Sequence, residues 1–200
     1  EYSNLYFDTP ENICLNDHIR ERKNKYKVRI RSYVNSNICF LEIKKKNVHG
    51  RTIKMRIQRT SEKWDSPLTD SEKRFLSERV PFASELSPVL YISYSRFTLA
   101  QLNRCERITL DTDLTYTTIQ GEISKPLNGL VVGELKQAET DRRSPLFVFL
   151  RSMPERTTQL GRIIKISKYV LGRLSSDDSL SPRTYLSKLK VLRRATKAIT

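Results

Sequence analysis

Residues 26–34 read Tyr-Lys-Val-Arg-Ile-Arg-Ser-Tyr-Val, and basic and apolar side chains alternate through the centre of this stretch. Successive side chains of a β-strand point to opposite faces of a sheet. Lys27, Arg29 and Arg31 would therefore share one face, while Val28 and Ile30 would share the other. This spacing predicts a strand with one basic face and one apolar face.

The next two segments repeat this alternation. Residues 38–45 and 52–58 also place polar and apolar side chains at alternate positions. The short polar connections at 35–37 and 47–51 are typical of hairpin loops, so the three segments predict an antiparallel meander. The polar faces of the second and third strands carry Glu42, Lys44, Lys54, Arg56 and Gln58.

The rest of the chain continues the strand-rich pattern and becomes helical toward its end. Further strands are predicted at 4–7, 89–97, 107–110, 116–119 and 130–136. A short helix or irregular arm is predicted at 11–22, and a helix capped by Asp70 or Ser71 should end before Pro81. Other helical segments are predicted at 145–152, 157–160 and 185–198. With 200 residues the chain fits one α+β domain, in which residues 175–200 form a linker and a basic helix.

The charge balance predicts an anionic partner. The chain has 37 Lys and Arg against 22 Asp and Glu, a formal net charge of +15. Nucleic acid, acidic membranes and phosphorylated small molecules would all match this charge. Like charges opposed on neighbouring strands destabilise a sheet, and a bound anion would remove that cost. An ordinary half-exposed sheet with its polar face in water is the alternative interpretation.

Two carboxylates stand among the predicted basic strand faces. Glu42 and Glu134 each precede a lysine by two residues, which suits a metal ligand placed beside phosphate-binding cations. Carboxylate and phosphate oxygens are the ligands that Mg²⁺ and Mn²⁺ prefer. Arg binds phosphate oxygens in a bidentate fork and Lys acts as a point charge. If the sheet curls into a barrel, its basic face becomes a lumen that would suit a linear polyphosphate.

Other site types find little support in the sequence. Cys14, Cys39 and Cys105 are widely separated, which predicts free thiols in a reducing compartment and no zinc site. The apolar stretches are too short for membrane insertion, so a soluble cytoplasmic domain is expected. No helix-turn-helix or zinc-finger pattern is present, so no nucleic-acid partner is expected. The oligomeric state stays open.

Taken in order, several short segments resemble the VTC domain, the polyphosphate polymerase domain of the triphosphate tunnel metalloenzyme (CYTH-like) superfamily. The resemblance extends from Leu5 to Leu171, and its strength lies in the order of the segments because no single one is specific. The segments are 5–9 (Leu-Tyr-Phe-Asp-Thr), 27–33 (Lys-Val-Arg-Ile-Arg-Ser-Tyr), 40–46 (Phe-Leu-Glu-Ile-Lys-Lys-Lys), 50–56 (Gly-Arg-Thr-Ile-Lys-Met-Arg), 94–97 (Tyr-Ser-Arg-Phe), 107–111 (Arg-Ile-Thr-Leu-Asp), 134–136 (Glu-Leu-Lys) and 167–169 (Ser-Lys-Tyr).

The resemblance implies an antiparallel β-barrel with a basic lumen and flanking helices. Such a tunnel would bind ATP and polyphosphate with Mn²⁺ or Mg²⁺ and transfer the γ-phosphate of ATP onto a growing chain. A non-catalytic polyphosphate-binding module and a triphosphatase of the same superfamily are the alternatives. Family members carry an N-terminal strand with its own Glu and Lys before the segment matching 5–9. The chain is expected to lack this first strand, and catalysis is expected only where the full protein supplies it.

The resemblance also assigns roles to individual residues. Glu134 would hold the metal, and Arg29, Arg31, Lys54, Arg107 and Lys168 would act in catalysis. Lys45, Lys46 and Arg59 are interpreted as solvated surface charges, Tyr169 as core packing, and Ser167 as either a phosphate ligand or a helix cap. The full set of predicted phosphate-binding residues is Lys27, Arg29, Arg31, Lys44, Lys54, Arg56, Arg96, Arg107, Lys136, Ser167 and Lys168.

Overall fold

The computed structural model describes residues 1–59, 63–101, 106–126, 128–129, 131–139, 141–152, 166–182 and 185–197. Its strands are β1 (Tyr2–Asp8), β2 (Lys25–Tyr33), β3 (Ile38–Lys46), β4 (Thr52–Arg59), β5 (Ser87–Gln101), β6 (Glu106–Thr117), β7 (Ile123–Ser124) and β8 (Val132–Lys136). Its helices are α1 (Ile13–Ile19), α2 (Asp70–Ser77), α3 (Pro145–Ser152), α4 (Lys168–Ser176) and α5 (Leu186–Lys197), with short 3₁₀ turns at Val34–Ser36 and Ala83–Glu85.

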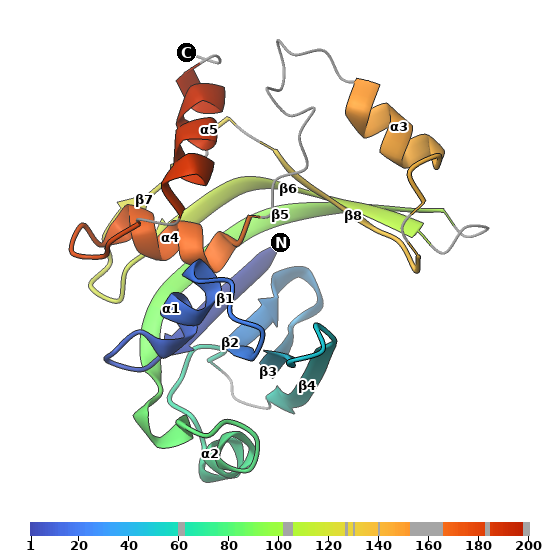
Figure 1. Ribbon diagram of the computed structural model, residues 1–200. Helices are drawn as coiled ribbons and strands as arrows, with labels where there is room; N and C mark the ends of the chain where they lie inside the picture. The colour runs from blue at the N-terminus through green and yellow to red at the C-terminus, as the bar shows by residue number, and fades with distance from the viewer. Residues whose placement is uncertain are drawn as a thin grey trace.

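The strands form one curved antiparallel sheet (Figure 1). Within the described residues it has eight strands, in the order β4-β3-β2-β1-β5-β6-β7, and β8 pairs with β6. The predicted meander β2-β3-β4 is confirmed. The N-terminal strand β1 lies between β2 and β5, so it joins the meander to the second half of the sheet.

The strand register aligns the basic faces. Arg29 on β2 lies opposite Glu42 on β3, and Glu42 lies opposite Arg56 on β4. Lys44 is opposite Lys27 on one side and Lys54 on the other. Cross-strand partners share a face of the sheet, so one face of the meander is lined with cations.

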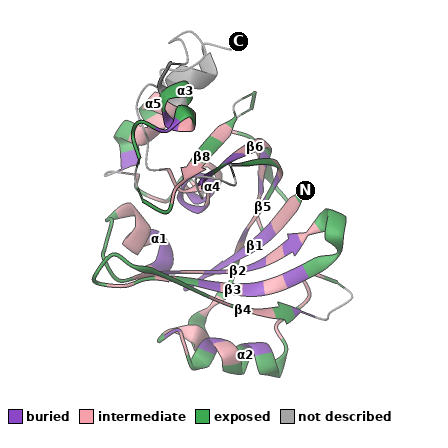
Figure 2. Cartoon of the chain, turned by 90° about the vertical axis from the view of Figure 1, so that its right-hand side faces the viewer, coloured by how far each residue is buried: buried purple, intermediate pink, exposed green. Residues whose placement is uncertain are grey.

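The apolar positions of the same strands form the core. Val28, Ile30 and Leu41 are completely buried, whereas their strand neighbours Arg29 and Arg31 are half-buried. Figure 2 shows this alternation of buried and intermediate residues along β2 and the centre of β3.

Helices α1 and α4 contact each other, and they pack against β2 and β5, respectively. Helix α4 lies on the concave, basic face of the sheet, because its Gly172 approaches Leu90, the cross-strand partner of Tyr6. The apolar side chains of β2 and β3 point to the opposite face, where α2 binds the end of β4.

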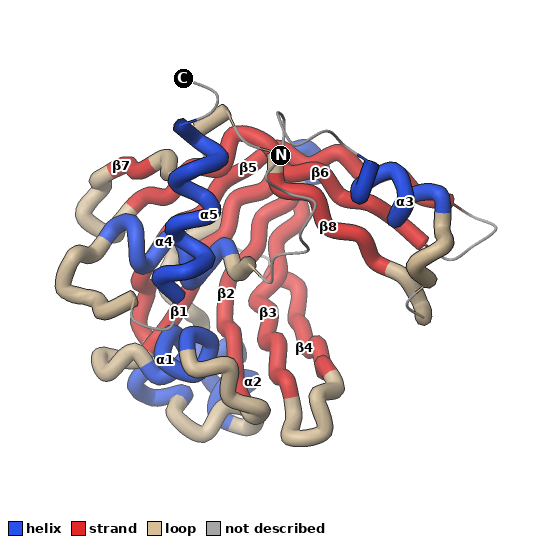
Figure 3. Tube along the Cα trace, turned by 45° about the horizontal axis from the view of Figure 1, so that its top comes forward, coloured by secondary structure: helices blue, strands red, loops and turns tan. Residues whose placement is uncertain are grey.

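The sheet is open across the described residues, so the predicted closed barrel is not confirmed. Strand β4 pairs only with β3, and β8 pairs only with β6, which leaves each with one free edge there. Figure 3 shows these two strands as separate borders of the curved sheet. The predicted α+β class with an antiparallel sheet and flanking helices is confirmed.

Several predicted boundaries differ from the observed ones. The segment 116–119 is not a strand of its own, because β6 runs without a break to Thr117. Helix α2 is capped by Thr69, whose side chain accepts a hydrogen bond from the Glu72 amide in a capping box. Helix α4 extends to Ser176, into the predicted linker. The predicted helix at 157–160 lies outside the described residues, and so does Cys105.

The interpretation of Arg59 as a solvated charge is wrong. Its side chain is buried, and its Nε lies 2.8 Å from the Glu72 carboxylate on α2. Its remaining donors bond the backbone carbonyl oxygens of Trp64, Ser66 and Pro67. The reason is that α2 and the segment before it fold back over the end of β4, which local sequence does not reveal.

None of the helices in the described ranges combines the length and the apolar composition needed to cross a membrane.

Candidate functional site

A polar cavity of about 690 Å³ lies on the concave face of the sheet. Strands β1 to β6, β8 and the start of α4 all contribute to its wall. The structure brings every predicted phosphate-binding and metal-binding residue to this cavity. These residues are Lys27, Arg29, Arg31, Lys44, Lys54, Arg56, Arg96, Arg107, Glu134, Lys136, Ser167 and Lys168.

Arg29 is held in a fixed orientation by two neighbours. Its Nε and Nη2 donate to one carboxylate oxygen of Glu42, at 2.8 and 2.6 Å, and its Nη1 donates to the Tyr6 hydroxyl at 2.9 Å. Glu42 was predicted to suit a metal ligand. Its carboxylate instead binds Arg29 and lies 4.0 Å from the Nε of Arg31. The guanidinium of Arg29 is therefore preorganised before any ligand arrives.

Arg31 lies near Glu42 and is also oriented by hydrogen bonds to two uncharged groups. Its Nε donates to the Asn4 side-chain oxygen at 2.8 Å, and its Nη2 donates to the Tyr94 hydroxyl at 3.0 Å. The guanidinium also lies over the Tyr2 ring, 5.4 Å from the ring centroid. Asn4 comes from β1 and Tyr94 from β5, so three strands fix this one side chain.

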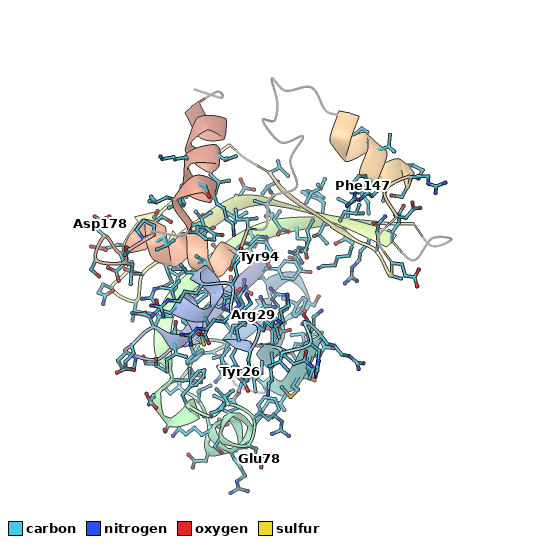
Figure 4. All side chains as sticks on the ribbon, viewed as in Figure 1. Tyr26, Arg29, Glu78, Tyr94, Phe147 and Asp178 are labelled. Atoms are coloured by element: carbon cyan, nitrogen blue, oxygen red, sulfur yellow. The ribbon has the colours of Figure 1, made fainter. Side chains whose placement is uncertain are left out.

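Arg96 and Lys168 meet at the buried carboxylate of Asp111. Arg96 donates through Nε and Nη2, at 2.5 and 2.8 Å, and the Lys168 ammonium lies 2.6 Å from the same carboxylate. Arg96 and Asp111 are direct partners across β5 and β6, whereas Lys168 comes from the first turn of α4. Figure 4 labels Arg29 and Tyr94, which lie where the central strands approach α4.

Lys27 lines the cavity beside the start of α4. Its ammonium donates to the Ser167 hydroxyl at 3.0 Å. Ser167 is also the N-cap of α4 and accepts a hydrogen bond from the Val170 amide. Both interpretations of Ser167 are therefore compatible, because one hydroxyl caps the helix and lines the cavity. Burial lowers the pKa of Lys27 from 10.5 to about 8.

Four further cations line the cavity without a carboxylate partner in the described part of the chain. Burial lowers the pKa of Lys44, and the neighbouring Lys54 lowers it further. The guanidinium of Arg56 lies 4.3 Å from the centroid of the Phe40 ring. A bound anion would neutralise these charges. The four residues are Lys44, Lys54, Arg56 and Arg107.

Glu134 is the exposed carboxylate of the cavity. It lies on β8 opposite Thr109, its side chain is 52% exposed, and its Oε2 lies 3.3 Å from the Lys136 ammonium. The described residues contain no group of three or more His, Cys, Asp or Glu that could hold a metal ion by themselves. Mg²⁺ commonly binds through one or two carboxylates and completes its shell with substrate phosphates and water. Glu134 fits that mode of binding.

Several side chains that shape the cavity were not predicted to do so. Asn4 and Tyr6 alternate along β1, but the predicted strand at 4–7 was too short to show which face was polar. Asp111 shares the polar face of β6 with Arg107, and that spacing was the available signal. Tyr169, interpreted as core packing, is buried, stacks on Tyr6 at 5.0 Å and also contributes to the cavity wall.

Residues 1–176 match the family model of the VTC domain. The chain belongs to the VTC domain family. A crystal structure of a Bacillus halodurans protein described as a candidate adenylate cyclase is 14% identical, with a TM-score of 0.44, and the match covers 84% of this chain and 79% of that one. A search of curated proteins found no sequence match. In this VTC domain the family match covers all the strands and the cavity residues contributed by α4.

Proposed function

We propose that this VTC domain binds a linear chain of phosphates in its cavity and transfers the γ-phosphate of ATP onto polyphosphate. The observation that supports this best is the charge of the cavity wall. Ten Lys and Arg side chains line it, against the two carboxylates of Glu42 and Glu134. An excess of cations in one concave site focuses the field on an anion. A ligand with many closely spaced negative charges matches it.

The distribution of the cations favours an extended anion over a single phosphate. They come from six strands and one helix, so they are spread along the wall. The cavity volume of about 690 Å³ falls within the range of small-molecule sites, roughly 300–1,000 Å³. A triphosphate with a nucleoside, or a short run of polyphosphate, could contact several of the cations at once.

The proposed reaction needs no activated side-chain nucleophile. A terminal oxygen of the acceptor polyphosphate attacks the γ-phosphorus of ATP, the bond from that phosphorus to the β,γ-bridging oxygen breaks, and ADP leaves. The cations of the wall align the two anions and stabilise the charge of the transferring group. Mn²⁺ or Mg²⁺ held by Glu134 and phosphate oxygens would supply further neutralisation of that charge.

Incubation of the protein with ATP and Mn²⁺, followed by gel electrophoresis for polyphosphate, tests this function. A ladder or smear of polymer that requires both ATP and metal is the expected result. Free phosphate without polymer would identify a triphosphatase instead. Neither product, from folded protein that binds inorganic tripolyphosphate, would refute the enzymatic proposal.

Glu134→Gln should abolish metal-dependent turnover while the fold remains intact. The substitution removes the carboxylate that would hold the metal, and the side chain is exposed, so little packing changes. The rate of polymer formation at saturating Mn²⁺ measures the effect, and circular dichroism checks the fold. Glu122→Gln, an exposed position away from the cavity, is the control. Unchanged activity of Glu134→Gln would remove this residue from the mechanism.

A non-catalytic polyphosphate-binding module is the second candidate. It is favoured by the ion pair between Glu134 and Lys136, which occupies the one acidic group proposed for the metal. Calorimetry with inorganic tripolyphosphate separates the two functions. Tight binding that is unchanged by Mn²⁺, together with no turnover of ATP, would select the binding module.

A further inference from the structure

Asp111 is a fully buried carboxylate that contacts the cavity cations but does not line the cavity. Both of its oxygens accept hydrogen bonds from Arg96, and Oδ2 is also the ion-pair partner of Lys168. Burial by itself would raise the pKa of this carboxyl, but the hydrogen bonds from Arg96 and Lys168 outweigh that and hold the pKa below its ordinary value. Asp111 is therefore ionised at neutral pH and cannot touch a ligand.

The shared carboxylate of Asp111 offsets the repulsion between two neighbouring cations. Arg96 and Lys168 come from β5 and α4, and both lie over the ring of Tyr94, at 5.3 and 5.4 Å from its centroid. Two cations brought this close would repel each other. One carboxylate between them offsets the repulsion and still leaves the trio with one net positive charge.

The contacts with Asp111 leave donors free for a ligand. An ammonium has three N–H donors and a guanidinium has five. Arg96 uses Nε and one Nη2 hydrogen on Asp111, and Lys168 uses one hydrogen. Both side chains line the cavity, so the unused donors belong to groups that a phosphate can reach. Because Arg96 and Lys168 share Oδ2, their nitrogen atoms lie near enough to contact one phosphate group.

We propose that Asp111 is a positioning residue: it binds Arg96 and Lys168 together so that the two cations act as one preformed phosphate subsite joining the sheet to α4. The proposal rests on the proposed phosphate-binding function of the cavity, and it adds a residue that never contacts the phosphate. An acidic group would thus strengthen the binding of a polyanion.

A positioning role for Asp111 predicts a change in anion affinity opposite to the change expected from its charge alone. Removing a negative charge from a basic site should tighten the binding of an anion. If Asp111 positions the two cations, Asp111→Asn should instead weaken the binding of inorganic tripolyphosphate, by about tenfold, which corresponds to the loss of one well-placed charge-assisted hydrogen bond. Glu134→Gln removes the same charge from an exposed position of the same cavity, and without metal it should bind tripolyphosphate at least as tightly as the wild type.

Isothermal titration calorimetry with tripolyphosphate, in EDTA and at fixed ionic strength, measures both variants. A loss of folded protein lowers the number of sites, whereas a positioning effect changes the dissociation constant of the folded fraction. Weaker binding by Asp111→Asn with an unchanged number of sites is the expected result. Binding as tight as that of Glu134→Gln would overturn the proposal.

A measurement on the wild-type protein covers the case in which Asp111→Asn does not fold. An ammonium bonded to a buried carboxylate exchanges its hydrogens slowly with water. NMR of ligand-free protein at pH 6 should show a lysine ammonium signal that disappears in Lys168→Met. A folded protein without that signal would contradict the ion pair and the proposal with it.

These outcomes separate the inference from the proposed function. Wild-type protein that binds tripolyphosphate but makes no polymer from ATP and Mn²⁺ would refute the polymerase activity, while the affinities of Asp111→Asn and Glu134→Gln would still decide the role of Asp111. Wild-type protein that does not bind tripolyphosphate would overturn both.

Discussion

At the scale of single residues, the cavity contains two groups whose charge changes just above neutral pH. Burial opposes ionisation of the Tyr6 hydroxyl, but the positive charges of Arg29, Arg31 and Lys27 outweigh it and lower its pKa from 10.0 to about 8. The pKa of Lys27 is also about 8, lowered mainly by its burial. The two groups influence each other, and both lose a proton as pH rises.

The affinity for tripolyphosphate should therefore fall as pH rises through about 8. Below this pH Lys27 is cationic and Tyr6 is neutral, whereas above it Lys27 becomes neutral and Tyr6 becomes an anion, so the cavity loses positive charge in both steps. Calorimetric titrations between pH 6.5 and pH 9.5 would measure the effect, using Lys27→Arg with Tyr6→Phe as the matched control.

The control keeps its charge at positions 6 and 27 over this range, because a guanidinium stays protonated and a phenyl ring does not titrate. Its affinity should follow only the titration of tripolyphosphate and of the cavity groups that both proteins share, so the difference between the two proteins reports on Lys27 and Tyr6. If the wild type and the double variant show the same pH dependence, neither Lys27 nor Tyr6 controls binding.

At the scale of elements, helix α4 is the piece that completes the cavity. Its N-cap Ser167 and its first residue Lys168 both line the wall, and its body packs against β5 and β6. Gly172 makes this packing possible. A Cβ added there would lie 2.3 Å from Tyr116 Cδ1 and 2.6 Å from Leu90 Cδ2. Both distances are shorter than non-bonded carbon atoms tolerate, so the added atom would clash with the two side chains.

Gly172→Ala should destabilise the protein and weaken tripolyphosphate binding together. The added methyl group must push α4 away from the sheet, which moves Ser167 and Lys168 from their positions. Thermal denaturation should show a loss of about 1–3 kcal/mol, typical of overpacking. Ser176→Ala on the same helix removes a buried hydroxyl that has no partner among the described residues, and it should leave both properties nearly unchanged. Equal effects of the two variants would contradict the packing argument.

Helix α2 depends on the buried pair of Arg59 and Glu72. Arg59→Ala should destabilise the fold by about 3–5 kcal/mol, because it leaves a buried carboxylate without its partner. Urea denaturation measures the change in the free energy of unfolding. Lys73→Ala, in an exposed pair with Asp70, is the control and should change stability by less than about 0.5 kcal/mol. A small effect of Arg59→Ala would mean that α2 is held by its apolar contacts alone.

At the scale of the whole molecule, about half of the net charge of +15 lies in the cavity wall, where ten Lys and Arg against two Glu leave +8. Many cations on one concave face repel each other in the folded state, and unfolding separates them. A ligand that binds only the folded state should therefore stabilise the protein strongly.

Saturating tripolyphosphate should raise the melting temperature. At a free concentration of one hundred times the dissociation constant, binding adds about 2.7 kcal/mol, which corresponds to roughly 5–10 °C for a domain of this size. Differential scanning calorimetry measures the shift, and sodium chloride at equal ionic strength is the control. An equal shift with chloride would show that general screening of charge, and not a site, is responsible.

Much of the architecture could be predicted because it depends on local alternation. The strands around Arg29, Lys44 and Lys54 were located from their period of two, and all twelve predicted site residues line one cavity. Their binding roles stay predictions. The closed barrel was not confirmed because closure depends on pairing between distant strand edges, such as those of β4 and β8, which no local pattern specifies.

The sequence by itself determined which side chains are cationic and which face of each strand they occupy, because side-chain direction in a strand follows from position alone. Only the tertiary structure decided which cations are tied to a partner. Lys168 of α4 meets Arg96 at Asp111 on strands that lie far earlier in the chain, and Arg59 meets Glu72 because α2 folds back over the end of β4. The alternation of basic and apolar residues along β2, β3 and β4 thus specifies a basic surface. The folding of α4 and α2 onto the sheet determines the chemistry of its individual charges.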